Sequence, residues 1–217
     1  MKTVRFVDGE TLPVGKILCL GRNYPEHARE MKAEVPSTPV LFLKPSTAIV
    51  YDGGSVVIPP LSSDVHHEIE LVVVIGRDGR DIREPEAMGH VAGYAVGLDM
   101  TLRDVQAEAK KKGLPWTVAK GFDTSAPLSA AARRDAVRDA GALALELRVN
   151  GTLRQQGNTA AMILGVPAII AYCSTLFTLE AGDLIFTGTP EGVGRVTHGD
   201  RLDARIAGVG TLTVGVV

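Results

Sequence analysis

The chain has 217 residues, of which 45 % are hydrophobic and 22 % are charged, a balance typical of a folded globular protein. Its net charge is −2, so the sequence predicts no nucleic-acid partner and no acidic membrane surface. Cys19 and Cys173 lie in apolar runs and form neither a disulfide framework nor a zinc spacing, which favours a reducing compartment. The first residues lack the apolar stretch of a signal peptide, and no apolar run approaches the ~20 residues of a membrane helix. We therefore expect a cytoplasmic protein.

The first chemically interesting segment is a helix near the N-terminus. Lys16–Leu20 predicts a short buried strand, and the turn after it leads into a helix with Pro25 near its first position. His27 and Glu30 are three residues apart in that helix and share a face. The pair is either a catalytic pair that polarises a water molecule or an exposed surface pair.

Two glutamates precede the most apolar strand of the chain. Leu71–Ile75 predicts a buried strand, and Glu68 and Glu70 before it point to the same face because side chains alternate along a strand. Two carboxylates held together repel each other and are costly to bury without a cation, and oxygen ligands suit Mg²⁺, Mn²⁺ or Ca²⁺. The alternative is a strand end whose solvent face carries two glutamates.

A third carboxylate ends the next apolar strand. Val91–Asp99 predicts a central strand that delivers Asp99 at its C-terminal end. The spacing of Thr101 and Asp104 predicts a capping box at the start of a helix that runs to about Lys112. Within that helix, Arg103 and Gln106 share one face close to Asp99.

The remaining elements are short strands and turns. Trp116–Phe122 predicts a short apolar strand, in which Lys120 is either a snorkelling edge residue or a functional cation. Asn150-Gly151 predicts a tight hairpin. A glycine-rich loop at 187–194 is not a P-loop, because no Gly-Lys-Ser/Thr follows. The pattern predicts a single α+β, β-rich domain over residues 1–217, a roll or barrel with a few outer helices.

Five stretches, in order along nearly the whole chain, together resemble the fumarylacetoacetate hydrolase superfamily, and most of all its single-domain acylpyruvase and oxaloacetate decarboxylase-like branch. They are Gly-Arg-Asn-Tyr-x-x-His-x-x-Glu at 21–30, His-x-Glu-x-Glu at 66–70, Asp-Met-Thr-x-Arg-Asp-x-Gln at 99–106, Lys-Lys-Lys-Gly-Leu-Pro-Trp-Thr-x-Ala-Lys at 110–120, and Thr-Gly-Thr-Pro-x-Gly-Val-Gly at 187–194.

The resemblance implies a role for each candidate residue and a mixed β-roll that forms a homodimer. It implies that Mg²⁺ or Mn²⁺ is held by Glu68, Glu70 and Asp99. It implies catalytic roles for His27, Glu30 and Lys120, with residues 22–36 forming a mobile lid. The implied substrate contacts are Arg22, Arg103, Gln106 and Thr189.

The implied activity is metal-dependent hydrolysis of the C–C bond of acylpyruvates, 2,4-dioxo acids such as acetylpyruvate or fumarylpyruvate, through a metal-stabilised pyruvate enolate. Two alternatives stay open. One is an oxaloacetate decarboxylase or tautomerase, or an isomerase–decarboxylase of aromatic catabolism. The other is a non-catalytic β-roll that binds a metal or a small acid, against which the presence of His27, Glu30 and Lys120 argues.

Overall fold

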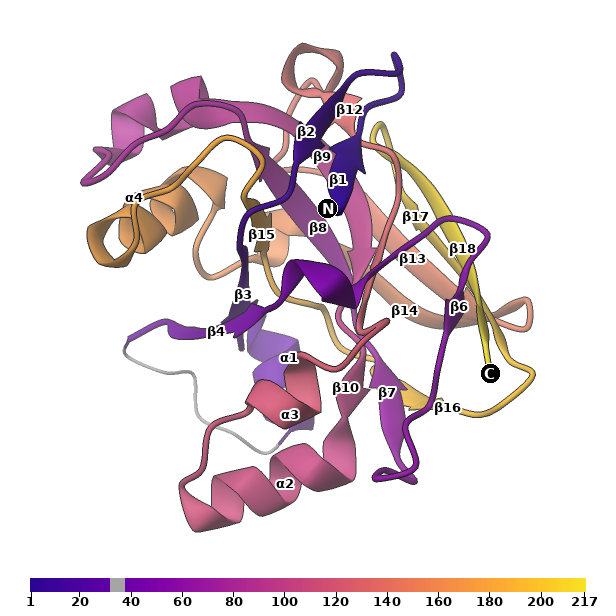
Figure 1. The fold of residues 1–217 in the computed structure, drawn as a ribbon. Coiled ribbons are helices and arrows are strands. Elements are labelled where there is room, and N and C mark those ends of the chain that lie inside the picture. Colours follow the sequence, from indigo (N-terminus) through magenta and orange to yellow (C-terminus); the bar gives the residue numbers. More distant parts are fainter. Residues whose placement is uncertain (32–37) are drawn as a thin grey trace.

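The protein is a β-rich structure with few helices, as the sequence predicts (Figure 1). The computed structural model describes residues 1–31 and 38–217. Its largest element is a mixed eight-stranded sheet, in which β12 (Ala132–Arg133) pairs with β9 beside the main path. The other strands follow in the spatial order β4 (Val40–Lys44), β3 (Ile17–Gly21), β15 (Leu184–Phe186), β8 (Ile69–Ile75), β9 (Val91–Leu98), β11 (Ala126–Leu128) and β5 (Ile49–Tyr51).

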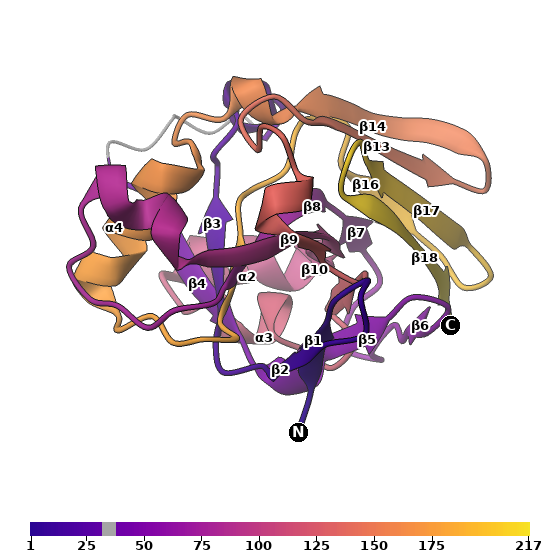
Figure 2. The ribbon, with the colours of Figure 1, turned by 90° about the horizontal axis from the view of Figure 1, so that it is seen from above.

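A five-stranded sheet lies on one side of the central sheet, and helix α4 (Val166–Leu176) lies at the opposite side (Figure 2). The predicted hairpin is part of the five-stranded sheet. Asn150 and Gly151 form its two-residue turn with φ of 51° and 79°, the left-handed conformation that this turn requires. The strands follow in the order β14 (Thr152–Asn158), β13 (Ala144–Val149), β17 (Arg201–Ile206), β18 (Gly210–Val216) and β6 (Ser55–Val56).

The smaller elements lie around these two sheets. Within residues 1–31 and 38–217, four short stretches of 3-10 helix cover Ser46–Ala48, Glu84–His90, Arg134–Ala136 and Thr159–Ala161. Two further sheets are β1 (Thr3–Arg5) with β2 (Thr11–Pro13), and β10 (Thr101–Leu102), β7 (Val65–His67) and β16 (Gly194–Val196). The remaining helices are α1 (Pro25–Glu30), α2 (Arg103–Lys112) and α3 (Thr117–Lys120).

Strand β8 is the centre of the core, because all seven of its residues are buried. Leu71 and Val73 contribute to one hydrophobic cluster, and Val72 and Val74 contribute to another on the opposite face of the strand. Each fully buried side chain of this kind contributes roughly 1.5–3 kcal/mol. The strand is therefore rigidly held, and so are the acidic residues at its N-terminal end.

The predicted capping box at Thr101 is wrong. Thr101 belongs to β10 and pairs with His66, and α2 begins at Arg103 without a side-chain cap. The carboxylate of Asp104 instead accepts hydrogen bonds from Ser62 Oγ at 2.6 Å and Ser63 N at 2.9 Å. Neither side chain caps the helix, because Thr101 Oγ1 accepts from Lys120 and the Asp104 carboxylate binds Ser62 and Ser63. The end of the helix is as predicted, with Gly113 in the left-handed conformation after Lys112.

The predicted strand at Trp116–Phe122 is also wrong, because the segment contains α3. Lys120 N donates to Trp116 O at 2.9 Å, and Gly121 N donates to Thr117 O at 2.7 Å. A short apolar run does not by itself distinguish a strand from a buried helical turn. Here the helical turn buries Ala119 and Lys120 together, whereas a strand would point them to opposite faces.

The predicted lid at 22–36 is described only in part. Residues 22–31 form the turn before α1 and the helix itself, and residues 32–36 lie outside the described residues. Closure of this segment over a ligand stays a prediction.

Candidate active site

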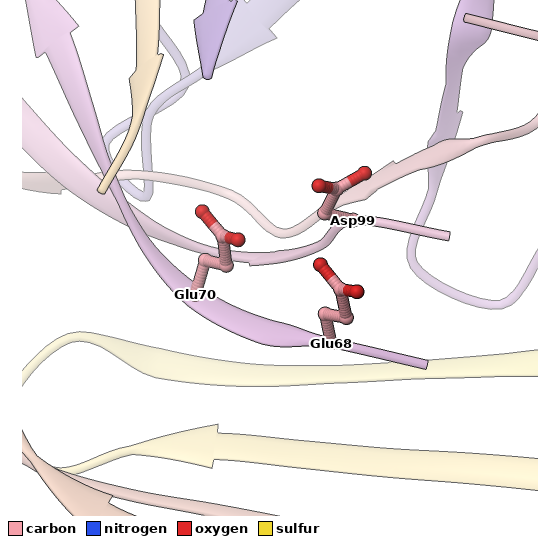
Figure 3. Close-up of side chains that lie close together, drawn as sticks. All are labelled: Glu68, Glu70 and Asp99. Atoms are coloured by element: carbon pink, nitrogen blue, oxygen red, sulfur yellow. The ribbon is translucent and has the colours of Figure 1, made fainter. Parts of the chain in front are cut away.

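The three predicted carboxylates meet in the interior. Glu68, Glu70 and Asp99 are each at most 4 % exposed, and one oxygen of each lies within 4.8 Å of the others (Figure 3). Strand pairing explains the meeting, because β8 and β9 are antiparallel and Ile69 pairs with Leu98. Asp99, the next residue, also donates its backbone N–H to Glu68 O at 2.8 Å. The interpretation of Glu68 and Glu70 as solvent-facing is therefore wrong.

Basic side chains neutralise two of these carboxylates. Lys120 Nζ donates to Glu68 Oε2 at 2.9 Å and to Asp99 Oδ2 at 2.6 Å, and the Arg103 guanidinium pairs with Glu68. Burial raises the pKa of Glu68, but the charges of Lys120 and Arg103 outweigh burial and hold that pKa well below its usual range. Glu68 is therefore ionised at neutral pH.

Glu70 has the opposite environment. Burial raises the pKa of its carboxyl well above the usual range, and the like charges of Asp99 and Glu68 raise it further. Its Oε2 accepts one hydrogen bond, from Gly188 N at 2.7 Å. Asp99 Oδ1 lies 2.8 Å from the nitrogen of Lys44, yet among the described residues no donor forms a well-directed hydrogen bond to it. Buried carboxylate oxygens that lack donors are what an oxygen-preferring divalent cation needs, so these three residues fit such an ion.

Lys120 is a buried cation and not a snorkelling edge residue. Its side chain is 4 % exposed, and Nζ also donates to Thr101 Oγ1 at 2.7 Å. Burial lowers the pKa of Lys120, but the carboxylates of Asp99 and Glu68 outweigh burial and raise it. The ammonium group is therefore a permanent positive charge beside the carboxylates.

Lys44 is a second buried cation, which the sequence analysis missed. It ends β4 and is 1 % exposed. Its Nζ lies 2.8 Å from Asp99 Oδ1, donates to Ser125 O at 2.9 Å, and also donates to Lys120 O at the end of α3. The sequence places this lysine directly after the apolar run Val40–Leu43, and that position is the signal that could have indicated its role.

The predicted His27–Glu30 pair lies on α1, and His27 lines the same pocket as the carboxylates. His27 is buried at 7 % exposure, and its Nδ1 lies 3.5 Å from Glu30 Oε2. Glu30 is more exposed, and its carboxylate accepts the N–H of Gly192. Burial lowers the pKa of His27, so the imidazole is unprotonated at neutral pH and can accept a proton. The pair is therefore not a simple exposed surface pair.

One pocket gathers the candidate residues. Arg22, Arg103, Gln106 and Thr189 all line it, together with His27, Lys120 and the three carboxylates; Glu30 is outside the lining. Arg103 Nη1 donates to Gln106 Oε1 at 2.8 Å, which agrees with their predicted common face. Arg22 has a φ of 61°, an uncommon conformation for a residue with a side chain.

The pocket has further lining residues that sequence reasoning missed. Trp116 and Lys110 belong to this group, and Lys110 Nζ lies 5.0 Å from the centre of the Trp116 ring. Burial, together with the positive charges of Arg103 and Arg22, lowers the pKa of Lys110 to about 8. The sequence analysis had no signal to separate Lys110 from Lys111 and Lys112, which follow it.

The glycine-rich loop supplies backbone donors to both halves of the site. Gly188 N binds Glu70, and Gly192 N binds Glu30. Both glycines have positive φ, and a Cβ on Gly192 would lie 2.2 Å from Arg154 O. The loop therefore favours glycine at these positions, and its backbone N–H groups bind acidic side chains.

The fold and the site together define the class of protein. The family model "Fumarylacetoacetate (FAA) hydrolase C-terminal" matches residues 16–217, and the chain belongs to the fumarylacetoacetate hydrolase family. The resemblance seen in the sequence, including the single-domain branch, is thereby confirmed.

Within this family the chain is similar to named enzymes. It is 54 % identical over 193 residues to the mitochondrial oxaloacetate tautomerase FAHD1 of Rattus norvegicus, covering 89 % of this chain and 87 % of the relative. The corresponding protein of Homo sapiens is 52 % identical over 200 residues, covering 92 % and 90 %. A crystal structure of fumarylpyruvate hydrolase from Pseudomonas aeruginosa in complex with Mn²⁺ and pyruvate superposes with a TM-score of 0.96 at 40 % identity, covering 100 % of this chain and 95 % of that one.

In the part of the chain that the structure describes, no helix is both long enough and apolar enough to cross a membrane. The relatives named above as tautomerases are mitochondrial, so the cytoplasmic location stays a prediction.

Proposed function

We propose that this protein catalyses the keto–enol tautomerisation of oxaloacetate with a divalent cation, Mg²⁺ or Mn²⁺, held by Glu68, Glu70 and Asp99. The observation that carries the proposal is a buried unprotonated base, His27, that shares one pocket with the carboxylates and with Lys120. The identity of 54 % to an oxaloacetate tautomerase supports this choice of substrate.

The charges of the site favour a dianionic substrate. Among the described residues, the charges of the three carboxylates are balanced by Lys44, Lys120 and Arg103. A bound divalent cation would supply Lewis-acid stabilisation for negative charge on the 2-oxo oxygen of the substrate. Arg22 and Lys110 also line the pocket, so a bound cation would leave the site with an excess of positive charge, which favours the two carboxylates of oxaloacetate.

The protein's own groups supply the proton transfer. Tautomerisation moves a proton from C3 of the substrate to the 2-oxo oxygen, and no other bond breaks. Nδ1 of His27 faces Glu30, so Nε2 is the nitrogen that would accept the C3 proton. Lys120 holds a fixed positive charge beside the carboxylates, where it could stabilise negative charge that develops on the 2-oxo oxygen of the substrate.

A second candidate is the hydrolysis of acylpyruvates such as acetylpyruvate or fumarylpyruvate. The His27–Glu30 pair favours it, because the same base could take a proton from a water molecule that attacks the distal carbonyl. The similar structure of a fumarylpyruvate hydrolase supports this alternative. Hydrolysis would release pyruvate and a carboxylic acid, whereas tautomerisation releases neither.

The two candidates are separated by measuring products. We expect Mn²⁺-loaded protein to accelerate the decay of the ultraviolet absorbance of enol-oxaloacetate without forming pyruvate. Treatment with EDTA should abolish the acceleration, and Mn²⁺ should restore it. Pyruvate formation from acetylpyruvate, with no effect on the decay of the enol, would overturn the tautomerase proposal and favour the hydrolase.

The proposed assembly is a homodimer that binds a small 2-oxo acid and no nucleic acid or membrane. Light scattering after size-exclusion chromatography should give a mass twice that of the 22.9 kDa chain. A monomer at micromolar concentration would contradict the dimer.

A further inference from the structure

Gln155 is a completely buried amide that connects the two halves of the site. It lies in β14, has 0 % exposure, and uses all four of its hydrogen-bonding positions. Its Oε1 accepts from Ile69 N at 3.0 Å and lies 3.0 Å from His67 Nδ1. Its Nε2 donates to Thr189 Oγ1 at 2.9 Å and to Pro190 O at 3.0 Å.

The two backbone partners fix the orientation of this amide. Ile69 N–H can only donate, so it requires the oxygen, and Pro190 O can only accept, so it requires the nitrogen. A flipped amide would place its NH2 group against the N–H of Ile69 and its oxygen against Pro190 O. Both contacts would then be repulsive, and these buried groups would lose their hydrogen bonds. Nε2 is therefore the group that donates to Thr189 Oγ1.

This orientation determines what the hydroxyl of Thr189 can do. Because Oγ1 accepts from Gln155, its own hydrogen is directed to another partner. Thr189 is 3 % exposed and lines the pocket with the carboxylates. Among the described residues, no acceptor takes the hydrogen of this hydroxyl, so the donor is available to an oxygen atom of a ligand.

The opposite end of the amide is anchored at the metal-binding strand. Ile69 lies between Glu68 and Glu70, so the hydrogen bond from its backbone ties Gln155 to both carboxylates. One rigid group thus sets the distance between the hydroxyl of Thr189 and the carboxylates.

We infer that Gln155 is a positioning residue, which makes Thr189 a hydrogen-bond donor to an anionic or carbonyl oxygen of the bound 2-oxo acid. This inference rests on the proposed function, since it assumes that a 2-oxo acid occupies the pocket.

The change Gln155→Glu tests this directly. The introduced side chain can still accept from Ile69 N and His67. Its second oxygen carries no hydrogen when ionised and at most one when protonated, and Pro190 O, which only accepts, takes that one, so none remains for Thr189. The hydroxyl would then donate to that oxygen and be lost to the ligand. Gln156→Glu is the matched control, since it adds the same charge one residue away at an exposed position that pairs with Glu146.

The measurement is the dissociation constant of oxalate from Mn²⁺-loaded protein by titration calorimetry. We expect Gln155→Glu to weaken oxalate binding about tenfold or more, since a hydrogen bond to a charged group is lost. Gln156→Glu should change it less than about twofold. The dissociation constant of Mn²⁺ itself should change less than about threefold in either variant, because the anchor at Ile69 is kept.

A double-mutant cycle with Thr189→Val identifies the route of the effect. If Gln155 acts through Thr189, the double variant should bind oxalate about as weakly as Thr189→Val alone. Independent losses, whose factors multiply, would overturn the inference. An unchanged oxalate affinity in Gln155→Glu, or an equal loss of Mn²⁺ affinity, would overturn it as well.

Two further results keep the test decisive. If Gln155→Glu does not fold, Gln155→Met removes the same donor without adding charge and should weaken oxalate binding in the same way. A parent protein that binds oxalate but does not act on oxaloacetate would contradict only the proposed function. A parent that binds no oxalate would overturn the present inference.

Discussion

Replacement of Lys44 by methionine tests whether the buried charges form one balanced unit. Methionine is similar in length and apolar, so it fills the space of the lysine stem without its charge. The change leaves Asp99 Oδ1 without its cation at 2.8 Å and Ser125 O without its donor at 2.9 Å. Removal of one partner from a buried ion pair typically costs about 3–5 kcal/mol when the other charge is left uncompensated. Asp99 keeps its ion pair with Lys120 at 2.6 Å, so we expect a loss near the lower end of that range, about 3 kcal/mol. That loss is a large part of the 5–15 kcal/mol by which most domains are stable.

Urea unfolding in the presence of EDTA measures this loss. The control is Lys112→Met, which removes an exposed ion pair with Glu108 at 2.7 Å. Surface ion pairs contribute at most about 1 kcal/mol, so the control should unfold close to the parent midpoint. Saturating Mn²⁺ should recover more stability in Lys44→Met than in the parent, since a cation near Asp99 compensates the missing charge.

Equal losses in Lys44→Met and Lys112→Met would refute this reasoning. Such a result would mean that Asp99 is neutral or solvated in the folded protein, and that Lys44 does not take part in the charge balance of the site.

Three other changes probe separate parts of the site. Glu70→Ala should abolish the rise in melting temperature that Mn²⁺ gives the parent; a shift of the same size would show that the ion binds elsewhere. His27→Ala should lower tautomerisation about 10²–10⁴-fold, the usual contribution of a general base, and an unchanged rate would assign the base to another residue. Because burial lowers the pKa of His27 below 6.5, the folded state binds fewer protons than the unfolded state, and stability should fall as the pH drops below about 6.5. The acidic limb of kcat/KM should lie at a lower pH, where His27 of the folded protein takes up a proton, and a profile with no acidic limb would contradict this. Gly192→Ala should destabilise the protein more than Gly199→Ala, since both have a φ of 91° but only a Cβ on Gly192 would meet Arg154 O; equal midpoints in urea would show that the loop adapts.

The local pattern of the sequence was sufficient to predict that two carboxylates share one face at the start of β8, but not whether they bind a cation. Side chains alternate along any strand, so Glu68 and Glu70 had to share a face, and the apolar run after them had to be buried. The Asn150-Gly151 hairpin and the end of α2 at Gly113 follow from backbone conformations that few residues adopt. The family motifs then added His27, Glu30, Lys120 and Asp99 to the candidate site. These features depend on neighbours in the chain, and neighbours are visible in a sequence.

Tertiary structure alone decided which distant groups complete the site. Lys44 reaches Asp99, Gln155 reaches Ile69 and Thr189, and Gly192 reaches Glu30 across separations of 34 to 162 residues. The conformation of Trp116–Phe122 was settled in the same way, since burial of Lys120 among carboxylates favours a helical turn over the strand that its apolar pattern predicts. Such contacts form because a buried charge or amide must find a partner after the sheets pack, and the identity of that partner depends on strand order and register, which no local pattern contains.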